Sequence, residues 1–211
     1  MLHGLTEIKL GNRQKAFADY TTALAIDPQN VEALVNRSAL LAVIGETSDA
    51  LRDLDAAITL DPRHALARFN RGYAHFARKD YGPAIADYTA ALTLEPKLGW
   101  AHLNRCLTRT IAGEDPVPAL ADCDEARKLM PGDPEVRETR GFVYLKMGDP
   151  KIALVEYDAA LTVNSNRPLA LYGRGLARVR CGDLKGGEDD KNAARALMPD
   201  IAREFVPYDL L

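Results

Sequence analysis

Asparagine recurs at a fixed spacing in this chain. Asn36, Asn70 and Asn104 lie 34 residues apart, and Thr139 and Gly173 continue the series. A carboxamide donates and accepts hydrogen bonds at once, so a row of them can hold the main chain of an extended peptide without requiring particular side chains. Alternatively, these side chains face water or bond locally, although asparagine is a poor residue for a helix interior. The spacing leaves both interpretations open.

Charged side chains keep the same period. Arginines directly follow the residues of this series, at Arg37, Arg71, Arg105, Arg140 and Arg174. An acidic series accompanies them at Asp19, Asp53, Asp87, Asp122, Glu156 and Asp190. A planar guanidinium can bind a carboxylate through two hydrogen bonds. We therefore expect ion pairs between neighbouring helices rather than a row of arginines that is free to bind anions.

Side chains typical of catalysis and metal binding show no ordered spacing. His3, His64, His75 and His102 form no His-x-x-His or paired-cysteine pattern. No serine, aspartate or glutamate stands in a recognisable nucleophile motif. We expect neither catalytic residues nor a metal site or cofactor, and we predict that the chain is not an enzyme.

The segments that carry these residues repeat as well. Proline recurs at Pro28, Pro62, Pro96, Pro131 and Pro199, with Ser165 in the gap, and turn residues recur at Gly11, Gly45, Lys79, Gly113, Gly148 and Gly182. Between them, apolar residues return every three or four positions, as in 31–44 and 48–60, which predicts two amphipathic helices in each unit. Proline ends the second helix because it lacks an amide donor. A period of this size indicates stacked helix hairpins, each unable to bury its apolar face alone.

Small and large residues face each other across each predicted hairpin. First helices carry Gly4, Ser38, Gly72, Cys106, Gly141 and Gly175, and second helices carry the small Ala16, Ala50, Ala84, Ala119, Ala153 and Gly187 and the large Tyr20, Leu54, Tyr88 and Tyr157. Close helix approach would offset the cost of about 1 kcal/mol for a helical glycine. The fourth repeat has a one-residue insertion beside Asp115 and Pro116, so we expect its second helix to begin late. The sixth has Gly187 and Lys191, so we expect its outer helix to pack most loosely.

Two of the three cysteines fall on these packing positions. Cys106 and Cys123 lie on the facing helices of the fourth hairpin. We favour two buried free thiols, because free cysteine commonly packs as a small apolar residue. A disulfide is the alternative, and it requires Cα atoms within about 7 Å of each other. Cys181 leaves an odd count, which argues against an oxidised secreted scaffold.

The repeated columns resemble the tetratricopeptide repeat family. The residues that carry the resemblance are Gly72, Tyr81, Ala84, Tyr88, Ala91 and Pro96, with Gly141, Ala153, Tyr157 and Ala160 in a later unit. The resemblance covers about residues 1–199 and implies an all-α, right-handed α-solenoid that forms a single domain over 1–211. Its six helix-turn-helix units are expected at about 1–30, 31–64, 65–98, 99–133, 134–167 and 168–199. A short capping helix is expected in 200–211, with Ile201 and Phe205 facing inward.

The resemblance also implies a concave groove lined by the first helix of each unit. The peptide-binding residues expected there are Asn36, Asn70, Asn104, Phe69, Tyr73, Trp100, Leu103 and Tyr172. The asparagine series resembles the ladder in the repeat domain of O-GlcNAc transferases. About half of the apolar and aromatic residues are expected to pack between neighbouring helices instead. Val35, Ala39 and Leu66 replace residues of the family's clamp for chaperone tails, so such tails are not expected as ligands.

These features predict a non-catalytic scaffold or adaptor that binds a peptide or partner protein in the groove. The alternative is a substrate-selecting or regulatory domain of a larger enzyme. A net charge of -3 and a pI of about 5.8 disfavour nucleic acid as a partner. No apolar run is long enough for insertion into a membrane.

The first predicted helix lacks its opening turn. This fits a fragment of a longer protein, or an N-terminal repeat that contacts a partner, including a second copy of the chain. We expect a cytoplasmic rather than a secreted protein, with a signal peptide upstream of Met1 not excluded.

Overall fold

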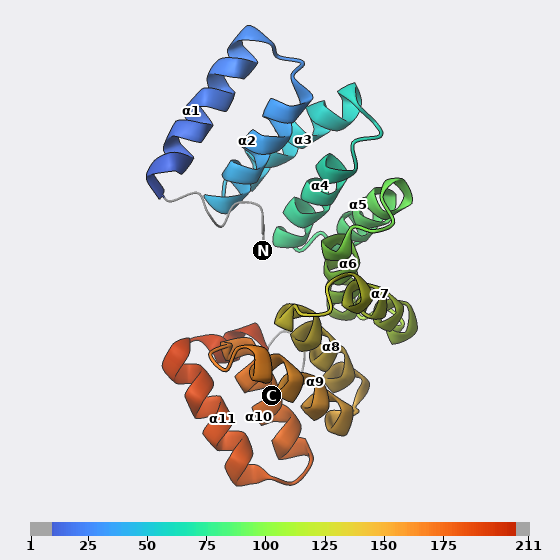
Figure 1. Ribbon diagram of the computed structural model, residues 1–211, viewed down its shortest axis with the longest axis vertical. Coiled ribbons are helices and arrows are strands. Elements are labelled where there is room, and N and C mark those ends of the chain that lie inside the picture. Colours follow the sequence, from blue (N-terminus) through green and yellow to red (C-terminus); the bar gives the residue numbers. More distant parts are fainter. Residues whose placement is uncertain (1–9, 206–211) are drawn as a thin grey trace. The chain divides into compact units, whose positions relative to one another are not determined.

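The computed structural model describes residues 10–205, which contain eleven α-helices, one short 3-10 helix and no strand (Figure 1). The helices are α1 (Leu10–Ile26), α2 (Val31–Val43), α3 (Thr47–Leu60), α4 (Ala65–Ala77), α5 (Tyr81–Leu94), α6 (Gly99–Ala112), α7 (Pro116–Leu129), α8 (Pro134–Met147), α9 (Pro150–Val163), α10 (Pro168–Arg180), α11 (Leu184–Leu197) and η1 (Ile201–Glu204). The predicted all-α solenoid of helix hairpins is confirmed. The first helix predicted for repeat one, with His3 and Gly4, lies outside the described residues, and self-association through it stays a prediction.

Each complete hairpin turns on one residue with a left-handed backbone. These residues are Gly45 (φ 86°), Lys79 (φ 66°), Gly113 (φ 74°), Gly148 (φ 82°) and Gly182 (φ 93°). Glycine adopts this conformation without the clash that a Cβ atom would cause, and Lys79 alone among the described residues adopts it with a side chain. The predicted turn positions are therefore confirmed, with one correction. Gly11 lies inside α1, where the helix continues through it at the modest cost of a helical glycine.

The insertion in the fourth repeat lies in the turn between α6 and α7. Gly113 precedes the first residue of α7, Pro116, by three positions, whereas Gly148 precedes the first residue of α9, Pro150, by two. The Asp115 carboxylate accepts a hydrogen bond of 2.9 Å from the Val117 amide and caps α7. The helix therefore begins one residue later after its turn, as predicted.

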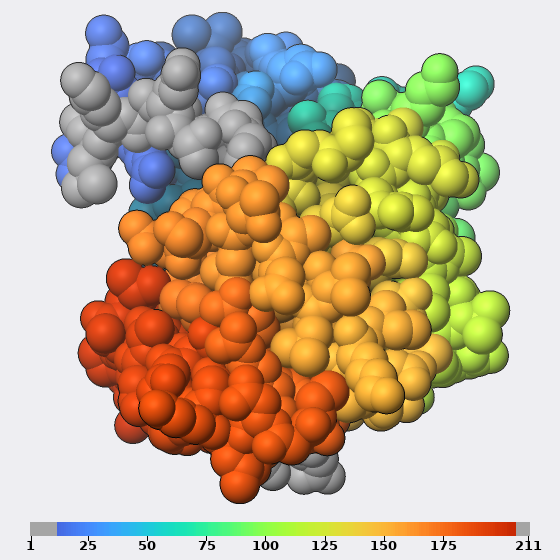
Figure 2. All heavy atoms as spheres, turned by 60° about the horizontal axis from the view of Figure 1, so that its bottom comes forward, coloured from blue at the N-terminus to red at the C-terminus, as the bar shows by residue number. Residues whose placement is uncertain are grey.

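The chain divides into two compact units, unit 1 (Met1–Ala101) and unit 2 (His102–Leu211). Within unit 1, one buried cluster contains Leu34 and Leu54, and a second contains Phe69 and Tyr88. Unit 2 has a large buried cluster that runs from Phe142 through Tyr157 to the C-terminal Phe205. In the space-filling view, the yellow-to-red residues of unit 2 form one continuous packed surface (Figure 2). None of the described helices is both long enough and apolar enough to cross a membrane.

Tyrosine rings fill the space beside helical glycines. A Cβ atom added to Gly72 would lie 2.8 Å from Cε1 of Tyr88, which is fully buried. In unit 2, a Cβ atom at Gly141 would lie 3.0 Å from Cε1 of Tyr157, and one at Gly173 would lie 2.3 Å from Cζ of the same ring. The predicted packing of small against large residues is present at these positions, and it explains the glycines.

The outer helix of the sixth repeat packs more closely than the sequence suggested. A Cβ atom at Gly175 of α10 would lie 2.7 Å from the carbonyl oxygen of Gly187 on α11, and a Cβ atom at Gly187 would lie 2.7 Å from the carbonyl oxygen of Gly175. The two glycines let the backbones approach, and the stem of Lys191 lies where other repeats place a large side chain. The expectation of loose packing is therefore wrong.

Cys106 on α6 and Cys123 on α7 form a disulfide, with Cα atoms 5.6 Å apart. Both residues are completely buried. The expected free thiols are thus corrected: the two positions face each other at a separation that a disulfide can bridge. Cys181 is free and exposed.

Candidate functional site

The two charged series meet in ion pairs within each complete hairpin. Arg71 donates two hydrogen bonds of 2.8 Å to Asp87, from Nε to Oδ2 and from Nη2 to Oδ1. The same two-bond arrangement joins Arg37 to Asp53, Arg105 to Asp122 and Arg174 to Asp190. Arg140 binds Glu156 through one hydrogen bond. All five acids are buried. The predicted ion pairs are confirmed, and these arginines have a structural role rather than forming a free row.

Several of these arginines also contact the preceding hairpin. Arg71 Nη1 lies 2.8 Å from Asp55 on α3, and Arg174 Nη1 lies 2.8 Å from Asp158 on α9. Hydrogen bonds from Arg71 to Asp87 raise the pKa of the Arg71 guanidinium, which stays protonated. The arginines therefore fasten hairpins to one another as well as closing each hairpin.

In unit 2 the three buried acids of the periodic series, Asp122, Glu156 and Asp190, each contact a second cation that sequence reasoning missed. Arg109 Nη1 lies 2.6 Å from Asp122, which His102 also contacts at 3.2 Å. Arg137 lies 3.1 Å from Glu156, and Arg178 lies 2.9 Å from Asp190. Arg109 and Arg178 are one helical turn beyond the first arginine, so a search at i+4 spacing would have found them.

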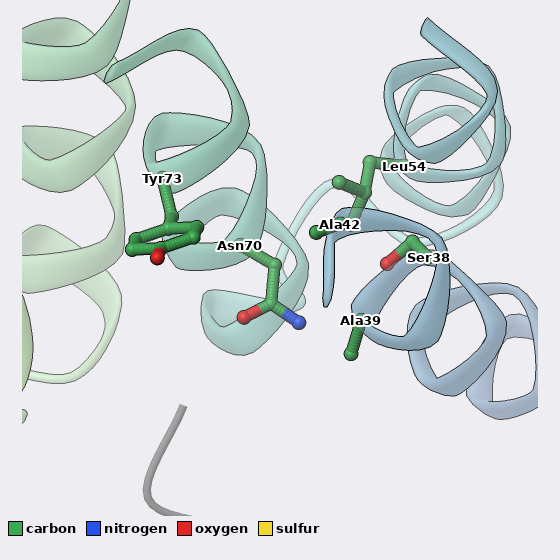
Figure 3. Close-up of a pocket in the computed structure, with 6 residues that line it drawn as sticks. All are labelled: Ser38, Ala39, Ala42, Leu54, Asn70 and Tyr73. Carbon is green, nitrogen blue, oxygen red and sulfur yellow. The ribbon is translucent and has the colours of Figure 1, made fainter. Parts of the chain in front are cut away.

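Asn70 on α4 faces a small surface hollow in unit 1. The hollow is shallow, without enclosed room for a water molecule, and is lined by Ser38, Ala39, Ala42, Leu54, Asn70 and Tyr73. Figure 3 shows the Asn70 carboxamide directed between the Tyr73 ring and the Ser38–Ala39 turn of α2. Asn70 is 7% exposed, and its Oδ1 atom has no hydrogen-bond partner among the described residues. The side chain thus presents a buried acceptor at the edge of the hollow.

Of the other candidates in unit 1, only Tyr73 joins Asn70 in this hollow. Asn36 is half-buried on α2 and does not line it. Phe69 is buried, with its ring centroid 5.8 Å from that of Tyr88. Trp100 is half-buried against the same cluster. Phe69 is therefore enclosed by the protein and does not present its ring to a ligand.

Two of the three candidates in unit 2 are buried in the protein. Leu103 is buried, and Asn104 is half-buried, with its main-chain oxygen accepting a hydrogen bond of 2.6 Å from Thr108. Tyr172 is buried, and its ring contacts Phe205 and the Arg195 guanidinium. At Gly173, the Tyr157 ring leaves no room for a carboxamide, so the asparagine series does not continue there.

The part of the chain that the structure describes contains no candidate metal site. No group of three or more histidine, cysteine, aspartate or glutamate side chains there could hold a metal ion.

Comparison with known proteins identifies a repeat family in part of the chain. Two family models for the tetratricopeptide repeat match the sequence, one over residues 1–30 and the other over residues 40–98. These two segments are recognised as tetratricopeptide repeats. A comparison of the sequence with curated proteins gives no match.

Solved structures of tetratricopeptide repeat proteins share the fold. YrrB, described as having an unusual peptide-binding site, is 21% identical, with a TM-score of 0.66 over 88% of this chain and 96% of YrrB. A tetratricopeptide repeat protein from Parabacteroides merdae is 23% identical, with a TM-score of 0.72 over 94% of this chain and 78% of that one. MamA is 25% identical, with a TM-score of 0.65 over 74% of this chain and 90% of MamA. Tetratricopeptide repeats generally act as scaffolds for protein–protein interaction and are typically non-catalytic.

Proposed function

We propose that this tetratricopeptide repeat protein is an adaptor that binds a peptide segment of a partner protein, and that Asn70 holds the peptide main chain across the surface of the hollow between α2 and α4. The observation that carries the proposal is the buried Asn70 Oδ1 atom without a partner among the described residues. A buried acceptor left without a hydrogen bond costs about 1–3 kcal/mol. A hydrogen bond donated to Asn70 Oδ1 by a main-chain N–H group of a bound peptide would remove that cost.

The chemistry of the hollow favours a main chain over a charged group. Its walls are the small Ala39 and Ala42 and the ring of Tyr73, and no lysine, arginine or acid lines it. The neighbouring Arg37 and Arg71 are occupied by buried carboxylates. A bound peptide would therefore be held by amide hydrogen bonds and apolar contact, and its affinity should depend only weakly on salt.

The test starts from peptides selected against the full chain from a displayed random library. We expect Asn70→Ala to weaken the binding of selected peptides by roughly 5- to 150-fold, the equivalent of one lost buried hydrogen bond. The matched control is Gln29→Ala, which removes an exposed carboxamide between α1 and α2 and should leave affinity unchanged. Fluorescence anisotropy gives the affinities, and circular dichroism checks that both variants are folded. Selected peptides that bind the folded Asn70→Ala variant as tightly as the wild type would refute the role of Asn70.

A further inference from the structure

The C-terminal segment of unit 2 covers two aromatic rings on first helices. The ring centroid of Phe205 lies 4.9 Å from that of Tyr172 on α10 and 6.4 Å from that of Phe142 on α8. Burial is nearly complete for all three, with exposed fractions of 4% for Phe205, 2% for Tyr172 and 8% for Phe142. The segment therefore fills an aromatic site on α8 and α10 with one of its own side chains.

Among the described residues, three apolar side chains attach this segment to the rest of unit 2, and Ala202, the smallest of them, is only partly buried. Ile201 is completely buried and Phe205 nearly so, whereas Arg203 and Glu204 are exposed. The backbone hydrogen bonds of the segment are local: the amides of Ile201, Arg203 and Phe205 each donate to the carbonyl oxygen three residues earlier. Among the described residues, its one ion pair is also local, between Arg203 and Asp200 at 3.4 Å. Within residues 10–205, its polar contacts thus stay between residues 198 and 205.

The site beneath Phe205 suits an aromatic side chain. The Tyr172 ring offers a face to Phe205, and the Arg195 guanidinium stands 5.9 Å from its centroid. Phe142 and Leu176 belong to the same buried cluster. Aromatic pairs add about 0.5–1.5 kcal/mol beyond the burial of their area, and such pockets commonly hold the anchor residue of a bound peptide.

We propose that residues 201–205 are an internal occupant of a peptide-binding subsite on α8 and α10, which a partner enters by displacing them. The partner is a peptide with a branched aliphatic residue followed four positions later by an aromatic residue, because this is the pattern of Ile201 and Phe205. The proposal rests on peptide binding as the function, but it uses none of the residues around Asn70. A short segment held mainly by two large side chains opens at lower free energy than the rest of the core, and its opening sets the fraction of molecules able to bind.

The first test measures binding of a fluorescent peptide that copies residues 198–205, Met-Pro-Asp-Ile-Ala-Arg-Glu-Phe. Binding is compared between full-length wild type, Phe205→Ala and the matched control Arg203→Ala, which alters an exposed side chain of the same turn. We expect Phe205→Ala to bind the peptide about tenfold or more tightly than wild type, because the site no longer has its internal occupant. Arg203→Ala should bind like wild type, and a peptide with alanine in place of its phenylalanine should not bind. Equal affinity of wild type and folded Phe205→Ala would overturn the proposal.

A second measurement uses the wild type alone, so that it stands even if Phe205→Ala disturbs the packing of α10. Amide exchange is followed by NMR in ¹⁵N-labelled protein with excess unlabelled peptide. Displacement should speed exchange at Arg203 and Phe205, whose amides are hydrogen-bonded within the segment. Unchanged exchange at saturating peptide would identify the segment as a permanent cap. If Asn70→Ala still binds this peptide, the subsite on α8 and α10 is separate from the hollow of unit 1. The role of the hollow is tested independently, with the library-selected peptides described above.

Discussion

Cys106 and Cys123 are bonded to each other at the two positions that Gly72 and Tyr88 occupy in the preceding repeat. In that repeat, the Tyr88 ring lies on the surface of Gly72 and fills the space between the helices. In the fourth repeat, a covalent bond joins two small side chains instead. The α6–α7 hairpin therefore depends on a bond where its neighbour depends on a ring.

Reduction should weaken unit 2 selectively. The disulfide joins residues 17 positions apart, and a loop of that length corresponds to about 3 kcal/mol of stabilisation. We expect tris(2-carboxyethyl)phosphine to speed amide exchange in α6 and α7 and to lower the midpoint of thermal unfolding. The double variant Cys106→Gly, Cys123→Tyr restores the pair found in the preceding repeat and should be insensitive to the reductant. If the wild type showed no response to complete reduction, the bond would not contribute to stability.

Two glycines of one hairpin should respond oppositely to alanine. A Cβ atom at Gly72 would lie 2.8 Å from Tyr88 and 3.2 Å from the carbonyl oxygen of Ala84, so Gly72→Ala should cost about 1–3 kcal/mol. Gly82 on α5 has no atom within 4 Å of its added Cβ, so Gly82→Ala should stabilise by up to about 1 kcal/mol. Urea unfolding of both variants provides the comparison. Destabilisation by both changes to the same extent would contradict the packing of Tyr88.

Arg71 should be far more important for stability than an exposed arginine. Arg71→Ala leaves the carboxylate of Asp87, which is 5% exposed, without its main partner, and breaking a buried pair from one side costs about 3–5 kcal/mol. Arg52 pairs with Asp49 at the surface, and Arg52→Ala should change stability by less than about 0.5 kcal/mol. Urea unfolding and amide exchange in α4 and α5 measure both. Equal effects of the two substitutions would show that the Arg71 pair is not stabilising.

Glu138 should make the protein less stable as the pH rises. Burial raises the pKa of this carboxyl group above its ordinary value of 4.5, and the hydrogen bond from Arg167 only partly opposes the shift. The folded state therefore holds the proton to higher pH than the unfolded state, and stability is lost as the pH rises from 4.5 through the folded pKa. Glu138→Gln cannot lose a proton, so its stability relative to wild type should increase over this range.

The exposed Glu188 provides the control for this pH dependence. Hydrogen bonds from Lys191 and Arg195 lower the pKa of its carboxyl group, so its contribution to stability is lost as the pH falls rather than as it rises. Glu188→Gln should therefore lose stability relative to wild type on going up to pH 4.5. Thermal unfolding between about pH 3 and 7 measures both variants. The same direction of change in both would contradict the burial of Glu138.

The hairpins and their ion pairs were predictable because both follow from spacing. Arg71 and Asp87 belong to series with one period on helices that must face each other, so their contact required no knowledge of detailed packing. The closing segment was equally readable, since Ile201 and Phe205 share one side of a short turn. These features depend on the repeat and on helical geometry alone.

Other features depend on side-chain packing that periodicity does not specify. Phe69 and Tyr73 lie on the same helix on either side of Asn70, yet Phe69 is buried against Tyr88 and Tyr73 lines the hollow. The apolar face of a helix spans about 100°, so sequence places both residues near the groove without deciding which one is covered. Gly187 suggested weak packing because it lacks a side chain, whereas the backbone of α10 uses the space. The state of Cys106 and Cys123 depended on a distance that only the structure supplies.

Arg71 binds Asp87 in its own hairpin and Asp55 in the one before, and Arg174 likewise binds Asp190 and Asp158. Each of these two blocks of the sequence thus carries an arginine that pairs with an acid on the second helix of the block before it. Duplication of one block in the gene would deliver complementary charges at both new junctions, so an ancestor of this chain could grow longer without evolving a new joint.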